Sequence, residues 1–368
     1  MLERFKHIMF EFGKNVFLGL DVGTSSVKMA EITVTEGKSI LTNYAWMPIA
    51  NIDGKSGYNT DFFDGALPRY LKKMIAEANF KAKNVYVSIP AFGGLITLID
   101  FPNMPKQDVA QAIKYEAHKY IPISLDEVAV SWGIIGEEKG IGAGVGDETG
   151  GEKRIQVLLV ATSKNKIAKY ENLVKNIGLK LDSIEIEVFP IVNSLVGNDQ
   201  GTFVILDIGA RVCNIIFVSK GIILANRNLD LGGSNFTKTI ASSMGIDEER
   251  AESLKVSGKD FFGKDSSISF PSLEIVMGEI SRLVEISVKN GKASKIDAII
   301  LSGGSAKLAG LADYLTNAFS VKTIIGNPLS RVGYDKRLQP MIEKIQTRFS
   351  VCIGLALKGA EGFMNNKN

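Results

Sequence analysis

Cysteine and histidine are scarce in this chain. Its 368 residues include two cysteines, Cys213 and Cys352, and two histidines, His7 and His118. The cysteines have neither metal-ligand nor disulfide spacing and stand in apolar segments, so we expect two small buried side chains. The histidines fall on different expected elements, which argues against a zinc site and against a Ser-His-Asp triad.

Long apolar runs and a strong net charge are also absent. No run approaches the length of a membrane span, and a formal net charge of +3 leaves no nucleic-acid footprint. Residues 1–12 lack the apolar core and cleavage site of a signal peptide, so secretion is not expected. Their apolar residues follow helical spacing, which leaves open a contact with a membrane surface, a partner or the protein's own body.

A pattern of strand, turn and strand occurs twice. The first apolar run ends at Asp21-Val-Gly23 and the second at Asp207-Ile-Gly209. In each case a glycine allows the backbone to approach a ligand closely, and a second β-prone run follows. A duplicated domain would let donors at the two turns hold the phosphates of one nucleotide, with the aspartates as magnesium ligands. Either motif alone is equally an ordinary turn.

Two Gly-Gly pairs add to this pattern. Ser302-Gly303-Gly304-Ser305 follows a buried-type strand and is expected to lead into a helix, leaving room for a purine against the backbone. A tight connection without a ligand is the alternative. Gly232-Gly233-Ser234 opens an expected helix, either to approach the nucleotide or because Ser234 caps that helix.

The two Asp-x-Gly turns and the Ser302–Ser305 segment, in this order along the chain, resemble the actin-like ATPase superfamily, which also holds sugar kinases, chaperone ATPases and FtsA. The resemblance covers nearly the whole chain and implies an α/β fold of duplicated RNase H-like domains. Residues 85–123, 157–187 and 327–328, with the closing Gly354-Leu-Ala-Leu, are similar to the PilM branch and imply an FtsA/PilM-type inserted subdomain. The short polar tail differs from the amphipathic membrane helix of FtsA.

The resemblance also implies a site for ATP with Mg²⁺. Glu187, at the first interdomain connection, is implied near the attacking water, and Asp21 is implied as a second catalytic residue. Asp21 and Asp207 are the implied magnesium ligands. Because the second loop has few hydroxyls, binding is better supported than fast hydrolysis, and Arg211 either pairs with phosphate or points to solvent. The implied nucleotide-binding residues are Asp21, Gly23, Thr24, Ser25, Ser26, Lys28, Asp207, Gly209, Ala210, Arg211, Gly232, Gly233, Ser234, Glu252, Lys255, Gly303, Gly304 and Ser305.

As a PilM relative, the chain is expected to be a cytoplasmic scaffold of type IV pilus assembly, peripheral at the inner membrane. The implied partners are the N-terminal cytoplasmic tail of a PilN-like protein, bound near the inserted subdomain, and other inner-membrane pilus proteins. The alternatives are a GspL-like secretion component, a filament-forming FtsA/MreB-like ATPase and a small-molecule kinase. For a kinase, none of Asp53, Asp61 and Asp100 stands out as a catalytic acceptor-site residue.

The pattern of the chain divides it into an N-terminal segment 1–15 and two lobes. The helix of the insertion begins after Pro105, ends before Pro122 and carries Val109, Ile113, Ala117 and Tyr120 on one packed face. The glycine-rich stretch 140–151 is expected to be a mobile hairpin loop. The expected limits are 16–91 and 163–199 for subdomain 1A, 92–162 for the inserted subdomain 1C, 200–245 and 294–368 for subdomain 2A, and 246–293 for subdomain 2B.

Overall fold

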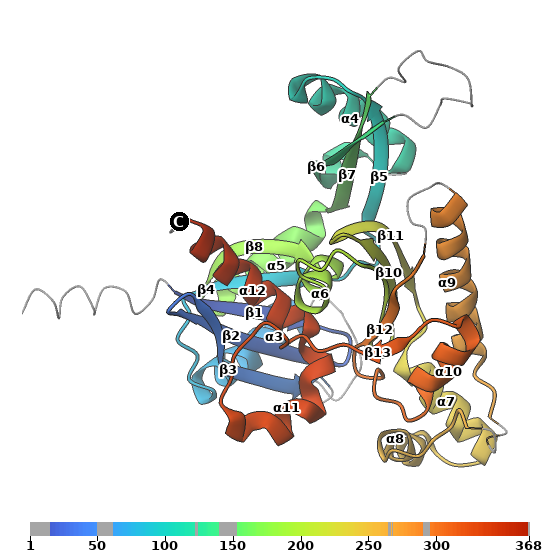
Figure 1. The fold of residues 1–368 in the computed structure, drawn as a ribbon. Coiled ribbons are helices and arrows are strands. Elements are labelled where there is room, and N and C mark those ends of the chain that lie inside the picture. The colour runs from blue at the N-terminus through green and yellow to red at the C-terminus, as the bar shows by residue number, and fades with distance from the viewer. Residues whose placement is uncertain are drawn as a thin grey trace, which may run out of the picture.

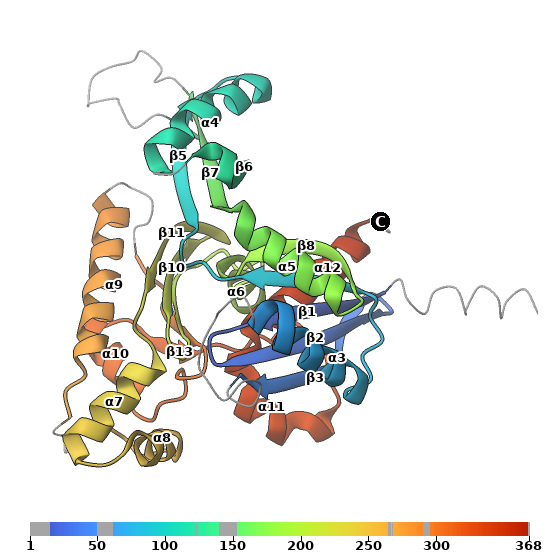
Figure 2. The same cartoon turned by 180° about the vertical axis from the view of Figure 1, so that it is seen from behind.

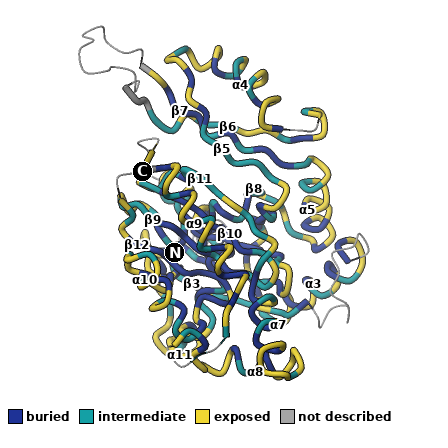
Figure 3. Tube along the Cα trace, turned by 90° about the vertical axis from the view of Figure 1, so that its right-hand side faces the viewer, coloured by how far each residue is buried: buried dark blue, intermediate teal, exposed yellow. Residues whose placement is uncertain are grey.

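The computed structural model describes residues 15–49, 62–121, 124–139, 153–263, 266, 268–289 and 295–366. Two lobes lie side by side, and a third, smaller unit rises from their junction (Figures 1 and 2). Buried residues concentrate in the central strands of both lobes (Figure 3). The amphipathic segment 1–12 and the glycine-rich loop 140–151 of the sequence analysis lie outside the described residues.

The first lobe is built on a five-stranded sheet with strand order β3-β2-β1-β4-β8. The chain enters by an antiparallel meander of three strands, and the other two strands run parallel to β1 after crossover connections. The π-helical turn η1 (Phe62–Ala66) and helices α3 (Leu67–Glu77) and α5 (Lys164–Asn176) pack on one face. The strands are β1 (Val16–Val22), β2 (Ser26–Thr35), β3 (Lys38–Pro48), β4 (Asn84–Ile89) and β8 (Lys180–Ile186).

The second lobe repeats this topology with strand order β11-β10-β9-β12-β13. Again three antiparallel strands come first and two parallel strands follow, so the predicted duplication is confirmed at the level of strand order. Its strands are β9 (Thr202–Ile208), β10 (Cys213–Ser219), β11 (Ile222–Leu229), β12 (Ala298–Ser302) and β13 (Thr323–Ile325). Its helices are α7 (Gly233–Met244), α8 (Glu248–Val256), α9 (Pro271–Lys289) and α10 (Leu311–Phe319).

The inserted unit is a three-stranded antiparallel sheet, β5-β7-β6, covered by one helix. Helix α4 (Lys106–Tyr120) follows Pro105 as expected, and Val109, Ile113 and Ala117 are buried against the sheet. Tyr120 is 42% exposed, so the predicted packed face ends one turn earlier. The strands are β5 (Leu95–Pro102), β6 (Val128–Lys139) and β7 (Lys153–Ser163), with a 3₁₀ turn η2 (Leu125–Glu127) before β6.

Two helices connect the lobes and pass each other closely. A Cβ on Gly354 of α12 (Ser350–Asn365) would lie 1.9 Å from the carbonyl oxygen of Pro190 in α6 (Val188–Leu195). One on Gly19 of β1 would lie 1.9 Å from the carbonyl oxygen of Cys352. Only glycine permits either approach. Helix α6 directly follows the interdomain connection expected at Glu187, and the two helices meet between the sheets.

The C-terminal part of the chain packs on the first lobe, although the sequence limits assigned it to the second. Ile353 and Ala356 of α12 contact the face of the first sheet opposite to α3 and α5, and Ile342 of α11 (Gln339–Ile345) joins the same core. The 3₁₀ turns η3 (Lys336–Leu338) and η4 (Gln346–Phe349) flank α11. The other predicted subdomain limits stay predictions. In the part of the chain that the structure describes, no helix is long and apolar enough to cross a membrane.

Candidate functional site

The turn between β1 and β2 places a buried ion pair at the junction of the lobes. Asp21 is the next-to-last residue of β1, and Lys28, which is opposite it on β2, brings its Nζ to 3.0 Å from Asp21 Oδ2. Ser88 of β4 donates its hydroxyl to Asp21 Oδ1 at 3.3 Å. Burial by itself would lower the pKa of Lys28, but the Asp21 carboxylate outweighs it and raises that pKa. The lysine therefore carries its charge in this site.

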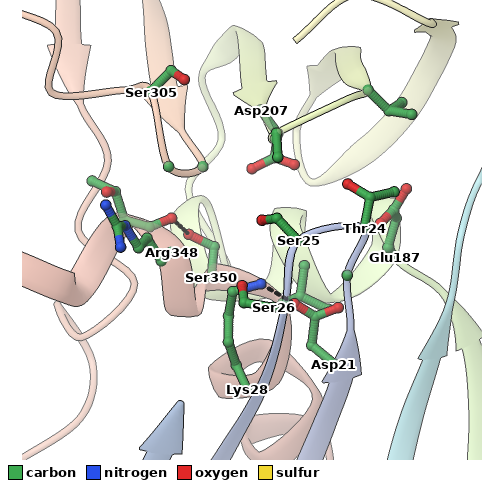
Figure 4. A pocket seen from close by; sticks show the side chains of 18 of the residues that line it. Asp21, Thr24, Ser25, Ser26, Lys28, Glu187, Asp207, Ser305, Arg348 and Ser350 are labelled. Atoms are coloured by element: carbon green, nitrogen blue, oxygen red, sulfur yellow. Dashed lines mark hydrogen bonds and ion pairs between the residues drawn. The ribbon is translucent and has the colours of Figure 1, made fainter. Parts of the chain in front are cut away.

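The matching turn of the second lobe holds a carboxylate with weaker compensation. Asp207 lies opposite Asn214 across the β9–β10 hairpin, and Gly209 closes the turn by donating its N–H to the carbonyl of Val212. Burial is the main cause that raises the pKa of Asp207, and the Asp21 carboxylate adds to the rise. In Figure 4 the Asp207 carboxylate extends toward Ser25 of the first turn. The duplicated motifs thus face each other across the space between the lobes.

Glu187, between β8 and α6, lies beside both aspartates. Its Oε1 accepts hydrogen bonds from the Ala91 N–H and from Asn214 Nδ2, each at 3.1 Å. The pKa of Glu187 is raised to about 7, mainly by burial and in part by the Asp207 and Asp21 carboxylates, although the two hydrogen bonds act to lower it. A carboxyl group with a pKa near neutrality can hold or release a proton during a reaction.

The strand-to-helix segment after β12 differs from its expected form. Gly303 has φ +86°, and a Cβ there would lie 2.4 Å from the carbonyl oxygen of Ile208, so glycine is required. However, the chain makes a series of turns after Gly304, and helix α10 begins only at Leu311. The expected helix N-terminus at this Gly-Gly pair is therefore wrong, and only the tight backbone is present.

Helix α7 begins against the second turn. The N–H groups of Gly233 and Ser234 donate to the carbonyls of Gly209 and Ala210, both at 2.9 Å. Asn235 Oδ1, and not Ser234, caps the helix by accepting the Gly232 N–H. Because these donors are already used within the protein, the Gly-Gly pair fixes the position of the turn and offers fewer free amides than expected.

A lysine is buried where α7 meets α8. Lys255 Nζ donates to the Gly233 carbonyl at 3.0 Å, to Thr237 Oγ1 at 2.7 Å and to Glu252 Oε2 at 2.5 Å. The Glu252 side chain is half exposed and faces the space between the lobes. This cluster forms the wall of the site on the side of the second lobe's helices.

Together these elements enclose a cleft of about 550 Å³ between the lobes (Figure 4). Four of the implied site residues do not line it: Arg211, Gly232, Gly233 and Ser234. Arg211 is instead 70% exposed and pairs with Asp230, its Nε 3.0 Å from Oδ1, so it points to solvent. The implied residues that do line the cleft are Asp21, Gly23, Thr24, Ser25, Ser26, Lys28, Glu187, Asp207, Gly209, Ala210, Glu252, Lys255, Gly303, Gly304 and Ser305.

Several cleft residues were not singled out from the sequence. The Arg348 guanidinium carbon lies 5.6 Å from the centre of the Trp46 ring, and both line the cleft. Phe92 lines it as well and is 59% exposed. None of them belongs to a motif, so no local signal marked them. Asn214 was within reach of sequence reasoning, because it stands opposite Asp207 in the predicted hairpin.

A magnesium ion fits the donor set of this cleft. Asp21 and Asp207 offer the carboxylate oxygens that Mg²⁺ prefers, and a cation would offset the burial and repulsion that raise the pKa of Asp207. Among the described residues, no three His, Cys, Asp or Glu side chains gather into a preformed metal site. Mg²⁺ commonly keeps several waters and uses one or two carboxylates, which matches this arrangement.

A second cavity, of about 470 Å³, lies between the first lobe and the inserted sheet. We call it the insertion groove. Its walls are largely apolar, whereas its polar groups include an ion pair between Lys358 of α12 and Glu185 of β8. The Thr162 hydroxyl is buried and has no hydrogen-bond partner among the residues that the structure describes. The groove is lined by Ile89, Ala129, Val130, Ser131, Trp132, Gly133, Leu158, Val160, Thr162, Ile167, Ile184, Glu185, Ile186, Phe189 and Lys358.

Comparison with known families identifies the group to which these features belong. The family model for type IV pilus assembly protein PilM matches residues 19–360. The chain belongs to the PilM family. Among curated relatives, FtsA of Escherichia coli K12 is 23% identical, with 96% of this chain and 92% of that protein covered. FtsA of Pseudomonas aeruginosa is 22% identical, with 94% and 89% covered. Membership in the PilM family confirms the resemblance stated from the sequence.

Solved structures agree on the fold. A PilM–PilN type IV pilus biogenesis complex is similar with TM-score 0.72 at 24% identity, covering 93% of this chain and 98% of the solved chain. MreB5 of Spiroplasma citri, solved bound to ADP, is similar with TM-score 0.50 at 14% identity, covering 96% and 99%. The expected actin-like α/β fold is therefore confirmed.

Proposed function

We propose that this protein is an ATP-binding scaffold of type IV pilus assembly that holds the N-terminal cytoplasmic tail of a PilN-like membrane protein. The observation that carries the proposal is the pair of duplicated turns that face each other across one cleft, with Asp21 and Lys28 on one side and Asp207 on the other. A nucleotide polyphosphate is the ligand that this symmetric arrangement suits best, since it needs donors and cations on both sides.

In this proposal, each wall of the cleft has its own part in binding ATP. Hydroxyls and amides of the first turn, with the Lys28 ammonium, bind the phosphates. Asp21 and Asp207 hold Mg²⁺, which would shield the phosphate charge. Gly303 and Gly304 leave room for the base, and Glu252 and Lys255 lie where the family resemblance puts the ribose. The relative MreB5, solved with ADP, has the same fold, which supports a nucleotide as the ligand.

Hydrolysis, where it occurs, would use Glu187. Its Oε1 is occupied by hydrogen bonds from Ala91 and Asn214, so the second oxygen is the one left to orient a water molecule. An ionised Glu187 can accept the proton of that water, whereas the protonated form cannot. Because the second turn contributes few hydroxyls, we expect slow turnover and a role in which binding matters more than rate.

The insertion groove is the proposed site of the PilN-like tail. The related PilM was solved as a complex with PilN, which supports this class of partner. Apolar walls would take one or two anchor side chains, while the unpaired Thr162 hydroxyl and the Glu185–Lys358 pair would meet peptide amides and carbonyls. Binding such a tail would hold the scaffold at the inner membrane as a peripheral protein, beside other pilus assembly proteins.

Two titrations test the proposal. By calorimetry, ATP with Mg²⁺ should bind the wild type, and Asp21→Ala and Lys28→Ala should each weaken binding by about 1–3 kcal/mol for a lost charged hydrogen bond. A synthetic peptide copied from the cytoplasmic tail of the PilN partner should bind with micromolar to nanomolar affinity. Unchanged ATP affinity in both variants contradicts the nucleotide site. A peptide that fails to bind with and without Mg-ATP contradicts the scaffold role.

A further inference from the structure

The cleft and the insertion groove share one wall. Ile89 of β4 faces the groove, and Pro90 and Phe92, directly after it, line the cleft. The same change of side occurs after β8, where Ile186 lines the groove and Glu187 lines the cleft. The two cavities are thus separated by two short segments, 89–92 and 184–189, whose neighbouring residues face opposite sides.

Glu187 joins these two segments through both its backbone and its side chain. Its N–H donates to the Ile89 carbonyl at 3.0 Å, and its Oε1 accepts the Ala91 N–H at 3.1 Å. The same oxygen accepts Asn214 Nδ2, which belongs to β10 of the second lobe. One carboxylate oxygen therefore contacts the shared wall and the opposite lobe at the same time.

The segment held by Glu187 leads directly into the insertion. Gly94 donates its N–H to the Ala91 carbonyl at 2.9 Å, and β5 starts at Leu95. From the other side, Lys166 Nζ donates to the Phe92 carbonyl at 2.6 Å. A Cβ on Gly94 would lie 3.3 Å from Ile186 Cδ1, a groove residue. Movement of Ala91 would therefore be passed both to β5 and to the floor of the groove.

We propose that Glu187 is a positioning residue that couples occupation of the cleft to the shape of the insertion groove. The inference rests on the proposed function, because it presumes that the cleft takes a nucleotide. A ligand that draws the lobes together changes the Asn214 contact, and Glu187 passes that change to Ala91 and β5. By thermodynamic linkage, a peptide in the groove then alters nucleotide affinity by the same factor.

The two tryptophans allow a test that needs no partner. Trp132 lines the insertion groove and Trp46 lines the cleft. In a Trp46→Phe background, the emission of Trp132 should change when Mg-ADP or a non-hydrolysable Mg-ATP analogue is added. Glu187→Gln keeps a carbonyl oxygen that can accept the Ala91 N–H, so the response should persist. Glu187→Ala removes the acceptor, and the response should disappear while nucleotide still binds by calorimetry.

The peptide gives the second readout. With wild type and Glu187→Gln, Mg-nucleotide should change the Kd of the synthetic PilN-like tail by about 5–150-fold, the usual range of coupling between sites. With Glu187→Ala, the Kd should be the same with and without nucleotide. Asn214→Ala removes the Glu187 contact from the second lobe, together with the hydrogen bond that Asn214 accepts from Asn228. It should reduce the coupling and serves where Glu187→Ala does not fold.

The outcomes separate this inference from the function on which it rests. If nucleotide binds the wild type but Trp132 emission and the peptide Kd do not change, the coupling is overturned and the nucleotide site stands. A full response in Glu187→Ala overturns it as well. If no nucleotide binds, the proposed function fails and the coupling fails with it. Peptide binding without nucleotide, measured in the same series, tests the scaffold role separately.

Discussion

The two turns of the cleft have the same backbone design and different chemistry. In the first, Asp21 is paired with the buried Lys28, and Thr24, Ser25 and Ser26 follow its glycine. In the second, the corresponding positions carry Ala210, Arg211 and Val212, and the pKa of Asp207 is raised, mainly by burial. Duplication has therefore kept the geometry, whereas charge and hydroxyl donors have been retained on one side only. In the proposed function, the first turn would bind phosphate and the second would help to hold the cation.

The largest effect on stability is expected from a substitution of Lys28, the partner of the first turn's aspartate. The Lys28 and Asp21 side chains are 12% and 8% exposed, and removing one partner of such a buried pair costs about 3–5 kcal/mol. Lys28→Met should lower the free energy of unfolding by that amount in urea titrations. Lys289→Met, in an exposed pair with Glu285, is the matched control and should have no measurable effect. A Lys28→Met protein as stable as wild type would show that Asp21 needs no partner.

Glu187 belongs to neither turn, and we expect it to determine the rate of ATP hydrolysis. With Glu187→Gln the single amide oxygen can still accept the Ala91 N–H, but the carboxylate that serves as base is lost, so phosphate release should fall by about 10²-fold, the lower end for a general base. Because the Glu187 pKa is raised to about 7, wild-type turnover should also increase as pH rises through that value. ATP affinity of the variant is measured alongside by calorimetry. Equal turnover in both proteins would reduce Glu187 to a structural role.

The two aspartates should separate stability from metal dependence. Asp207→Asn removes a carboxylate whose pKa is raised in the folded protein, mainly by burial, so the free energy of unfolding should stay the same or rise. The Mg²⁺-dependent part of ATP binding should nevertheless weaken by about 1–3 kcal/mol. Asp21→Asn should lower the free energy of unfolding and also weaken the Mg²⁺-dependent part of ATP binding, since Lys28 is then left buried without its partner. If both variants behave alike, the functional difference between the turns does not exist.

The raised pKa values predict how stability depends on pH. Glu187 binds its proton more tightly in the folded protein, with a pKa of about 7 against 4.5 for the free group. Its stabilising effect is therefore fully present below about pH 4.5 and is lost as pH rises through about 7. The slope is at most about 1.4 kcal/mol per pH unit for one proton. Urea titrations of wild type and Glu187→Gln across this range should differ in slope, and parallel curves would contradict the assignment.

Sequence reasoning reached the parts of this site that rest on local pattern. The Asp-x-Gly turns predicted two facing loops, because an apolar strand that ends in Asp and Gly can be recognised from a few consecutive residues. The connection at Glu187 followed from the family resemblance. The sequence did not mark Trp46, Arg348 and Phe92, because tertiary packing brings each of them to the cleft and produces no periodic pattern in the sequence. Similarly, the sequence limits did not anticipate that α12 packs on the first lobe, since its contact with β1 depends on Gly19, which is distant along the chain.

Arg211 offers the smallest and most discriminating comparison. The sequence left two possibilities for it, a bond to phosphate or exposure to solvent, and its pairing with Asp230 at 70% exposure favours the second. Arg211→Ala should therefore leave both ATP affinity and stability unchanged, because exposed ion pairs contribute little. Arg348→Ala is the matched control: this arginine lines the cleft beside Trp46 and Gly304, and its loss should weaken ATP binding. The reverse result, with Arg211 required and Arg348 dispensable, would mean that the second turn rearranges on binding and that its own arginine replaces the missing hydroxyls.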